Sequence, residues 1–224
     1  MPLNRLITSG CSYTQYCWPT WADYLATAFD HHLQLGKSGM DCARIARVLL
    51  DTEVTKNDVV VICWTGFDRF NYQSEDKWQG LGSMLCNKDF YTKFYTAEER
   101  FATMYDAMTL IDRDSKTRGY QDWHFSAFPW LLGEIEKKPN PENIMRSQSR
   151  DLDNLFMQED LESYKIGIND PRTSHKYNQD DDHPTPECHW KWLKQVILPK
   201  IKIDLDLGDR VKLDQQRALK GDVD

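Results

Sequence analysis

The sequence predicts a three-layer α/β/α domain in which helices cover both faces of a parallel sheet of about five strands. Short apolar runs that suit strands alternate along the chain with segments of helical periodicity. The run Asp58–Trp64 is dominated by Val and Ile without a polar break, as a strand buried on both faces requires. The chain has 224 residues, which is enough to bury one continuous core.

The first half of the chain predicts three strands and two helices. The expected elements are, in order, a strand over residues 3–8, a helix with Trp21, Leu25, Ala28 and Phe29 on one face, a strand over 32–35, a helix over 41–51 with Ile45, Val48 and Leu49 on one face, and a strand over 58–64. Gly36 and Gly39 follow the second strand and are expected to end it.

The second half is less regular. Residues 65–95 are rich in aromatic side chains without clean periodicity, so we expect an insertion of short helices or loops. Thr96 and Glu99 form a capping-box pattern that predicts a helix to about residue 114. The remaining expectations are a strand over 123–127, a loop over 137–143, a helix over 144–164, and a helix that begins after Thr185 with Pro186 in its first turn and ends by Pro199.

The C-terminal tail departs from the strand-helix pattern. Apolar residues alternate with Lys and Asp over residues 201–207, which favours an edge strand or a strand that pairs with a partner chain. We expect residues 214–224 to be frayed. The tail therefore offers a route to a homo-oligomer.

The composition argues against nucleic acid and membranes as binding partners. The net charge is −7 with both signs intermixed, which argues against a basic surface for nucleic acid. No stretch approaches the roughly 20 apolar residues that span a bilayer, and the first residues lack the apolar core of a secretory signal. We therefore expect an intracellular protein that binds neither nucleic acid nor membrane. The six scattered cysteines are expected to be free thiols, with a zinc site on Cys11 and Cys17 as a weak alternative.

Four segments are predicted to lie beyond the carboxyl ends of the strands, where open α/β sheets bind their ligands. They are residues 10–14, 36–41 and 65–69, and the segment 180–183 that returns late in the chain. The first contains Ser12 directly after a glycine turn, and the last contains Asp180 and His183 three residues apart. A nucleophile, a base and an acid could meet there.

This arrangement resembles the SGNH (GDSL-type) hydrolase family, in which a Gly-Asp-Ser motif follows strand one and Asp-x-x-His lies close to the C-terminus. The resemblance implies that Ser12 is the nucleophile, His183 the general base and Asp180 the carboxylate that orients the imidazole. It implies that the backbone N–H of Ser12, at the start of a helix, and that of Gly39 bind the oxyanion. Residues 1–199 would form the hydrolase-like domain, with an insertion at about 65–95 and an extension at 200–224.

Two positions depart from the family pattern. Cys11 replaces the aspartate of Gly-Asp-Ser, which is not the catalytic acid of the family. Residues 64–69 contain no asparagine, so the third oxyanion donor has no direct match. The Thr65 hydroxyl, the Gly66 N–H and the Arg69 guanidinium are the candidates to replace it.

The sequence thus predicts a serine esterase that cleaves small acyl esters, including O-acetyl groups on carbohydrate, with no cofactor or metal. Trp64 and Phe67 are candidate walls of the substrate pocket, although such aromatic residues are more often core. His183 could instead be a surface histidine, or could join the carboxylates of residues 180–182 and His189 in a metal site. Two other functions stay open: an acyltransferase on the same fold, and a non-catalytic binding or assembly module.

Overall fold

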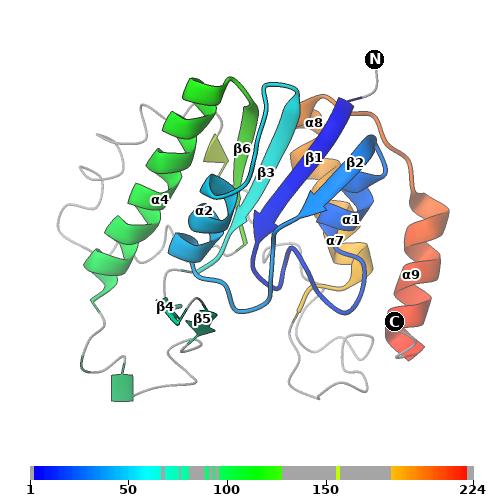
Figure 1. Ribbon diagram of the computed structural model, residues 1–224. Coiled ribbons are helices and arrows are strands. Elements are labelled where there is room, and N and C mark those ends of the chain that lie inside the picture. Colours follow the sequence, from blue (N-terminus) through cyan, green and yellow to red (C-terminus); the bar gives the residue numbers. More distant parts are fainter. Residues whose placement is uncertain are drawn as a thin grey trace.

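A five-stranded sheet lies at the centre of the computed structural model, with strands in the order β2-β1-β3-β6-β7 (Figure 1). Every neighbouring pair of strands is parallel, which confirms the predicted fold class. The structure describes residues 3–66, 69–75, 77–80, 89–90, 93, 96–127, 155–156 and 183–220. The strands of the sheet are β1 (Leu3–Gly10), β2 (Phe29–Gln34), β3 (Asp58–Trp64), β6 (Gln121–Ser126) and β7 (Leu155–Phe156).

Helices cover both faces of this sheet (Figure 1). One face packs against α2 (Cys42–Leu50) and α4 (Ala97–Arg118), and the other against α1 (Trp21–Ala26), α7 (Pro186–Trp192) and α8 (Leu198–Ile201). The last helix, α9 (Gly208–Lys220), lies alongside α7. No helix in the described ranges has the length and apolar character needed to cross a membrane.

All seven residues of β3 are buried because its side chains enter two separate cores. Val61 and Cys63 pack with Trp192 of α7, whereas Val60 and Ile62 pack with residues of α2 and α4. Alternate side chains of a strand point to opposite faces, so burial on both faces requires the unbroken apolar run seen in the sequence. The predicted bounds of this strand are confirmed.

Two glycines allow the turn after β1 to pack tightly against the sheet. A Cβ atom on Gly10 would collide with the Thr14 hydroxyl and lie 2.8 Å from the Cys63 carbonyl oxygen. A Cβ atom on Gly36 would lie 2.8 Å from Cγ2 of Thr14. Thr14 is fully buried between these glycines. The turn that carries Ser12 is therefore held against the carboxyl ends of the first two strands.

The helix predicted around Trp21 is shorter than its apolar stripe suggested. α1 ends at Ala26, and Phe29 is the first residue of β2 rather than part of the helix. Phe29 pairs with Leu3 of β1 in parallel register. Sheet pairing therefore outweighs the helical spacing of Ala28 and Phe29. The helix predicted to end near residue 114 extends instead to Arg118, where Gly119 adopts a positive φ of 79°.

Residues 65–95 were expected to form short helices or loops, but residues 71–80 form an antiparallel hairpin. Its strands are β4 (Asn71–Ser74) and β5 (Lys77–Gly80), and it lies beyond the carboxyl ends of β1 and β3 (Figure 1). Asn71 is the one buried residue of β4; the other three are exposed. A polar, mostly exposed strand carries no apolar alternation, so no pattern in the sequence predicts a strand here.

The C-terminal helix begins as predicted, with Thr185 as N-cap and Pro186 in the first turn. It does not end by Pro199. A π-helical segment, Leu193–Ile197, joins α7 to α8, and the Leu198 N–H donates to the Leu193 carbonyl. Proline cannot donate a hydrogen bond, and a wider turn just before it lets the helix continue.

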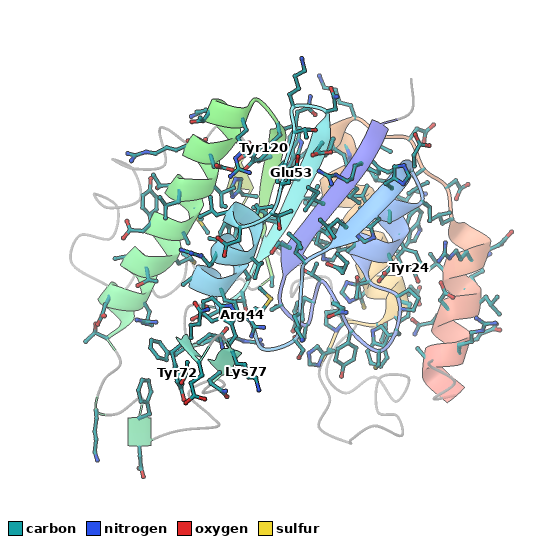
Figure 2. The ribbon with its side chains drawn as sticks, viewed as in Figure 1. Tyr24, Arg44, Glu53, Tyr72, Lys77 and Tyr120 are labelled. Carbon is teal, nitrogen blue, oxygen red and sulfur yellow. The ribbon has the colours of Figure 1, made fainter. Side chains whose placement is uncertain are left out.

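The tail is neither an edge strand nor frayed over residues 201–220. Residues 203–207 form no strand, and their alternating apolar side chains pack on the protein's own core. α9 then covers Tyr24, whose hydroxyl donates to Asp214 at 3.3 Å (Figure 2). Residues 155–156, predicted as part of a helix over 144–164, form β7. The predicted loop at 137–143 lies outside the described residues.

Candidate active site

Ser12 lies in a single turn directly after β1. The N–H groups of Thr14 and Gln15 both donate to the Cys11 carbonyl, at 2.9 and 3.2 Å, and Ser12 is 2% exposed. The prediction that Ser12 starts a helix is wrong, because the first helix begins only at Trp21. Pro19 disfavours a helical conformation at the residue before it, which separates this turn from α1.

The loop that carries Ser12 meets the segment that carries His183, although the two are far apart in sequence. The Tyr16 ring stacks on the His183 imidazole with 4.1 Å between centroids and 14° between planes. Tyr13 meets the same imidazole edge-on at 5.5 Å. Trp18 Nε1 donates to the Pro184 carbonyl at 2.9 Å, across 166 residues of sequence. These contacts bring the first and last candidate segments to one place in the fold.

The two side chains themselves are not hydrogen bonded. Among the described residues, the Ser12 hydroxyl makes no hydrogen bond. The loop of Ser12 and the segment of His183 are thus in contact, but the Ser12 hydroxyl and the His183 imidazole are not hydrogen bonded. Catalytic hydrogen bonds are often long in a structure without substrate and shorten when it binds. Asp180, the expected orienting carboxylate, lies outside the described residues.

Gly39 lies in a tight turn, and its N–H makes no hydrogen bond to a described residue. The Met40 N–H donates to the Lys37 carbonyl at 3.2 Å, and Gly39 has φ of 81°, which together describe a type II turn. An L-residue is strained at this φ, so the turn favours glycine. A Cβ atom on Gly39 would find nothing within 4 Å. The described structure therefore leaves open space beside the predicted oxyanion donor.

Asp41 and Asn71 clasp each other beside this turn. The Asn71 N–H donates to Asp41 Oδ2 at 2.6 Å, and the Asp41 N–H donates to Asn71 Oδ1 at 2.7 Å. The other Asp41 oxygen caps α2 by accepting from the Arg44 N–H at 2.8 Å. Burial raises the pKa of Asp41, while the N–H groups of Arg44 and Asn71 oppose that shift. Both carboxylate oxygens are thus committed to backbone donors.

Asn71 also holds the glycine turn directly. Its Nδ2 donates to the Gly39 carbonyl at 3.2 Å, which links the hairpin to the predicted oxyanion loop. The sequence did contain a signal for Asp41, since an aspartate before an apolar helix is a common N-cap. It contained none for Asn71, whose role depends on where the hairpin folds back.

The three candidates for a third oxyanion donor differ in their surroundings. Thr65 is fully buried, and within the described structure its hydroxyl makes no hydrogen bond. Its carbonyl accepts from the Cys42 thiol at 3.4 Å. Gly66 is buried and Arg69 is half-buried. An unsatisfied buried hydroxyl is costly, which distinguishes Thr65 from the other two as a group with an unused donor.

A second imidazole lies near His183. His189 of α7 is 1% exposed, and burial together with nearby His183 lowers its pKa to about 3. This residue is therefore neutral at ordinary pH. The described residues hold no cluster of three or more His, Cys, Asp or Glu side chains suited to a metal ion.

Trp64 belongs to the core rather than to an exposed pocket wall. Its side chain is 0% exposed, and its Nε1 donates to His124 Nδ1 at 3.0 Å. The other nitrogen of His124 lies 2.8 Å from Asp122. Because Nδ1 accepts a hydrogen bond from the Trp64 N–H, we assign His124 as the tautomer that carries its proton on Nε2. Phe67, the other predicted wall, lies outside the described residues.

Comparison with known proteins supports the fold. No protein family and no curated protein matches the sequence. Among solved structures, the YxiM protein of Bacillus subtilis is similar, with a TM-score of 0.52 at 12% sequence identity. The match covers 91% of this chain and 58% of YxiM, so the chain spans little more than half of that protein's length. At this identity the likeness shows the fold alone, an α/β/α sandwich around a parallel sheet.

Proposed function

We propose that the protein is a serine esterase that cleaves small acyl esters, with Ser12 as nucleophile, His183 as general base and Asp180 as the orienting carboxylate. The observation that carries the proposal is the stacking of Tyr16 on His183, which joins the serine loop to the histidine segment. A histidine without a role at this site would not need contacts with both the Tyr13 and the Tyr16 rings. The SGNH-like fold adds support, because in open α/β sheets this edge binds ligands.

The reaction proceeds through an acyl-enzyme. Ser12 Oγ attacks the ester carbonyl carbon, and His183 accepts the hydroxyl proton. The bond to the alcohol oxygen then breaks, and His183 returns the proton to the departing alcohol. Water, deprotonated by His183, attacks the acyl-serine, which releases the carboxylic acid and regenerates Ser12.

The oxyanion is bound by donors at the carboxyl edge of the sheet. The Gly39 N–H is unused by its own turn and borders open space, and the Ser12 N–H is the second donor. The unsatisfied Thr65 hydroxyl is the best-supported replacement for the missing asparagine. Loss of one such donor costs roughly 10²–10³ in rate, so Thr65→Val should slow ester cleavage by that factor.

Hydrolysis of aryl acetates by the purified protein tests this proposal. Ser12→Ala should abolish the activity, whereas Ser38→Ala, an exposed serine beside Gly39, should retain it. Circular dichroism and thermal unfolding check that both variants fold. Equal rates for the wild type and Ser12→Ala would overturn the nucleophile assignment.

Two alternatives give different results in the same assays. An acyltransferase passes the acetyl group to an added sugar, so product analysis with a sugar acceptor present separates transfer from hydrolysis. A non-catalytic binding module shows no Ser12-dependent cleavage at all. Exposed Tyr72 on β4 adds mild support for an O-acetyl carbohydrate as the substrate, because aromatic rings provide stacking surfaces.

A further inference from the structure

Arg44 is partly buried and forms no ion pair with a described carboxylate. It lies in the first turn of α2, and its guanidinium is 5.5 Å from the centre of the Trp78 ring. Its Nε is shielded from solvent and has no hydrogen-bond partner in the described part of the chain. Figure 2 shows Arg44 at the end of α2 that faces the hairpin carrying Tyr72 and Lys77.

Asp41 acts on the Arg44 guanidinium electrostatically but does not bind it directly. Both oxygens of Asp41 accept from backbone N–H groups, and no ion pair joins Asp41 to the Arg44 guanidinium within the described ranges. Burial lowers the pKa of Arg44, and Asp41 only partly offsets this. Burial of a guanidinium that no described carboxylate binds is costly, so an anionic ligand at this position would be favoured.

A second arginine lies at the same edge of the sheet. Arg69 is half-buried, makes no ion pair with a described residue, and is close enough to Cys42 of α2 to lower its thiol pKa against the larger effect of burial. The neighbouring Arg100 is different, because it pairs with Glu99 at 3.7 Å and covers the Phe70 ring. Arg44 and Arg69 therefore remain available to a ligand, in a chain whose net charge is −7.

Arg44 is connected to the turn of Gly39, the predicted oxyanion donor, through the β4–β5 hairpin. Asn71 holds the Gly39 carbonyl and pairs with Gly80 at the end of β5. Trp78, which backs the Arg44 guanidinium, is two residues along that strand, a rise of about 7 Å. The hairpin therefore contacts both Arg44, through Trp78, and the Gly39 turn, through Asn71.

We propose that Arg44 forms an anion-binding subsite that recognises a carboxylate or phosphate group on the ester substrate. The proposal rests on the esterase assignment and adds the charge of the substrate to it. Arginine is suited to this role because its planar fork binds carboxylate and phosphate oxygens through paired hydrogen bonds. The Trp78 ring holds the guanidinium plane from one side.

Three aryl acetates test the subsite: phenyl acetate, 4-acetoxybenzoate and 4-acetoxyphenyl phosphate. They share the reacting ester and differ in the charge at the far end of the ring. For the wild type, kcat/KM should favour at least one anionic ester by about 10–100-fold, mainly through a lower KM, as expected of a charge-assisted hydrogen bond. Preference for one anionic ester over the other identifies the oxyanion as carboxylate or phosphate.

Arg44→Gln and Arg47→Met form a matched pair of variants. Arg44→Gln should bring the ratio of anionic to neutral kcat/KM close to one. Arg47 lies one turn later on the same helix, is exposed and pairs with Asp51 at 2.9 Å, so Arg47→Met should leave the ratio unchanged. The subsite is overturned if the wild type shows no anionic preference, or if Arg44→Gln retains that preference.

A binding experiment separates this proposal from the esterase assignment. Titration of Ser12→Ala protein with 4-hydroxybenzoate, 4-hydroxyphenyl phosphate and phenol, followed by NMR, requires no catalysis. Binding of an anionic phenol that is lost in the Ser12→Ala/Arg44→Gln double variant supports the subsite even if no ester is cleaved. Ester cleavage without such binding supports the esterase and rejects the subsite.

Discussion

The Tyr16 ring lies face to face with the His183 imidazole, with 4.1 Å between the two centroids. Tyr16 is on the loop after β1, and His183 lies two residues before Thr185, the N-cap of α7. The stacked ring fixes the plane of the imidazole, while Tyr13 contacts it edge-on. A general base must present its nitrogen in one direction, so this packing bears directly on the proposed chemistry.

Replacing Tyr16 by leucine should therefore reduce ester hydrolysis by about 10–100-fold, because a misplaced catalytic group loses orientation. The loss should appear in kcat more than in KM, since Tyr16 acts on the base. Tyr16→Phe keeps the stacking ring and serves as the control. Equal activity of the leucine and phenylalanine variants would show that the ring does not position His183.

Asn71→Ala should weaken the Gly39 turn and slow catalysis. The substitution removes the hydrogen bond to the Gly39 carbonyl and leaves the Asp41 N–H without its side-chain acceptor. We expect a loss of about 1–3 kcal/mol in the free energy of unfolding and a fall in kcat of about tenfold or more. Chemical denaturation and steady-state kinetics measure the two effects.

Gln73→Ala is the control for this prediction, because Gln73 lies on the exposed part of the same strand. It should change neither stability nor kcat. If Asn71→Ala lowers stability but leaves kcat unchanged, the clasp supports the hairpin without affecting the oxyanion turn.

Stability should depend on pH through His189. Its pKa is about 3 when folded and about 6.5 when unfolded, so between these values the unfolded chain binds the extra proton. The free energy of unfolding should fall as pH decreases from 6.5 towards 3, with a slope of at most about 1.4 kcal/mol per pH unit from this residue. Denaturation series across this range should show a flatter profile for His189→Leu than for the wild type.

The Arg5–Asp58 ion pair should stabilise the sheet near the amino-terminal ends of β1 and β3, away from the candidate site. Arg5 Nη2 and Nε donate to the two Asp58 oxygens at 2.6 and 2.9 Å. Burial raises the pKa of Asp58, but the Arg5 and Thr55 hydrogen bonds outweigh it and lower the pKa below 3.8. The pair therefore contributes above pH 3.8 and is lost as pH falls below that value.

Arg5→Met should cost about 1–3 kcal/mol at pH 7. The difference in free energy of unfolding between the variant and the wild type should shrink only below pH 3.8. The effect of His189, in contrast, begins as pH falls below 6.5. A difference that is constant with pH would show that Arg5 acts through packing alone.

The sequence predicted those elements whose signal is local. β3 was recognised because burial on both faces requires an apolar run, and the start of α7 because Thr185 and Pro186 mark it. α9 was missed because it is a polar helix with one narrow buried stripe, formed by Val211, Asp214 and Ala218. In residues 201–207, before α9, apolar residues alternate with charged ones because the apolar side chains pack on the core, and not because the segment pairs as a strand.

The candidate site was predictable to a similar degree. Ser12, Gly39 and His183 could be selected because they follow or precede recognisable elements. Asn71 and Arg44 could not, since their significance depends on a hairpin of polar residues that folds against α2. Trp64 lies in the core, and an aromatic residue at the end of a strand gives no sign in the sequence of which side covers it.

Labelling with a fluorophosphonate probe tests the central claim, that His183 activates the Ser12 hydroxyl from the far end of the chain. Mass spectrometry of the digested protein should locate the adduct on Ser12. The labelling rate should fall by about 10³-fold or more in His183→Ala, as expected when a catalytic base is removed. Labelling at the same rate in both proteins, or an adduct that does not lie on Ser12, would contradict the account.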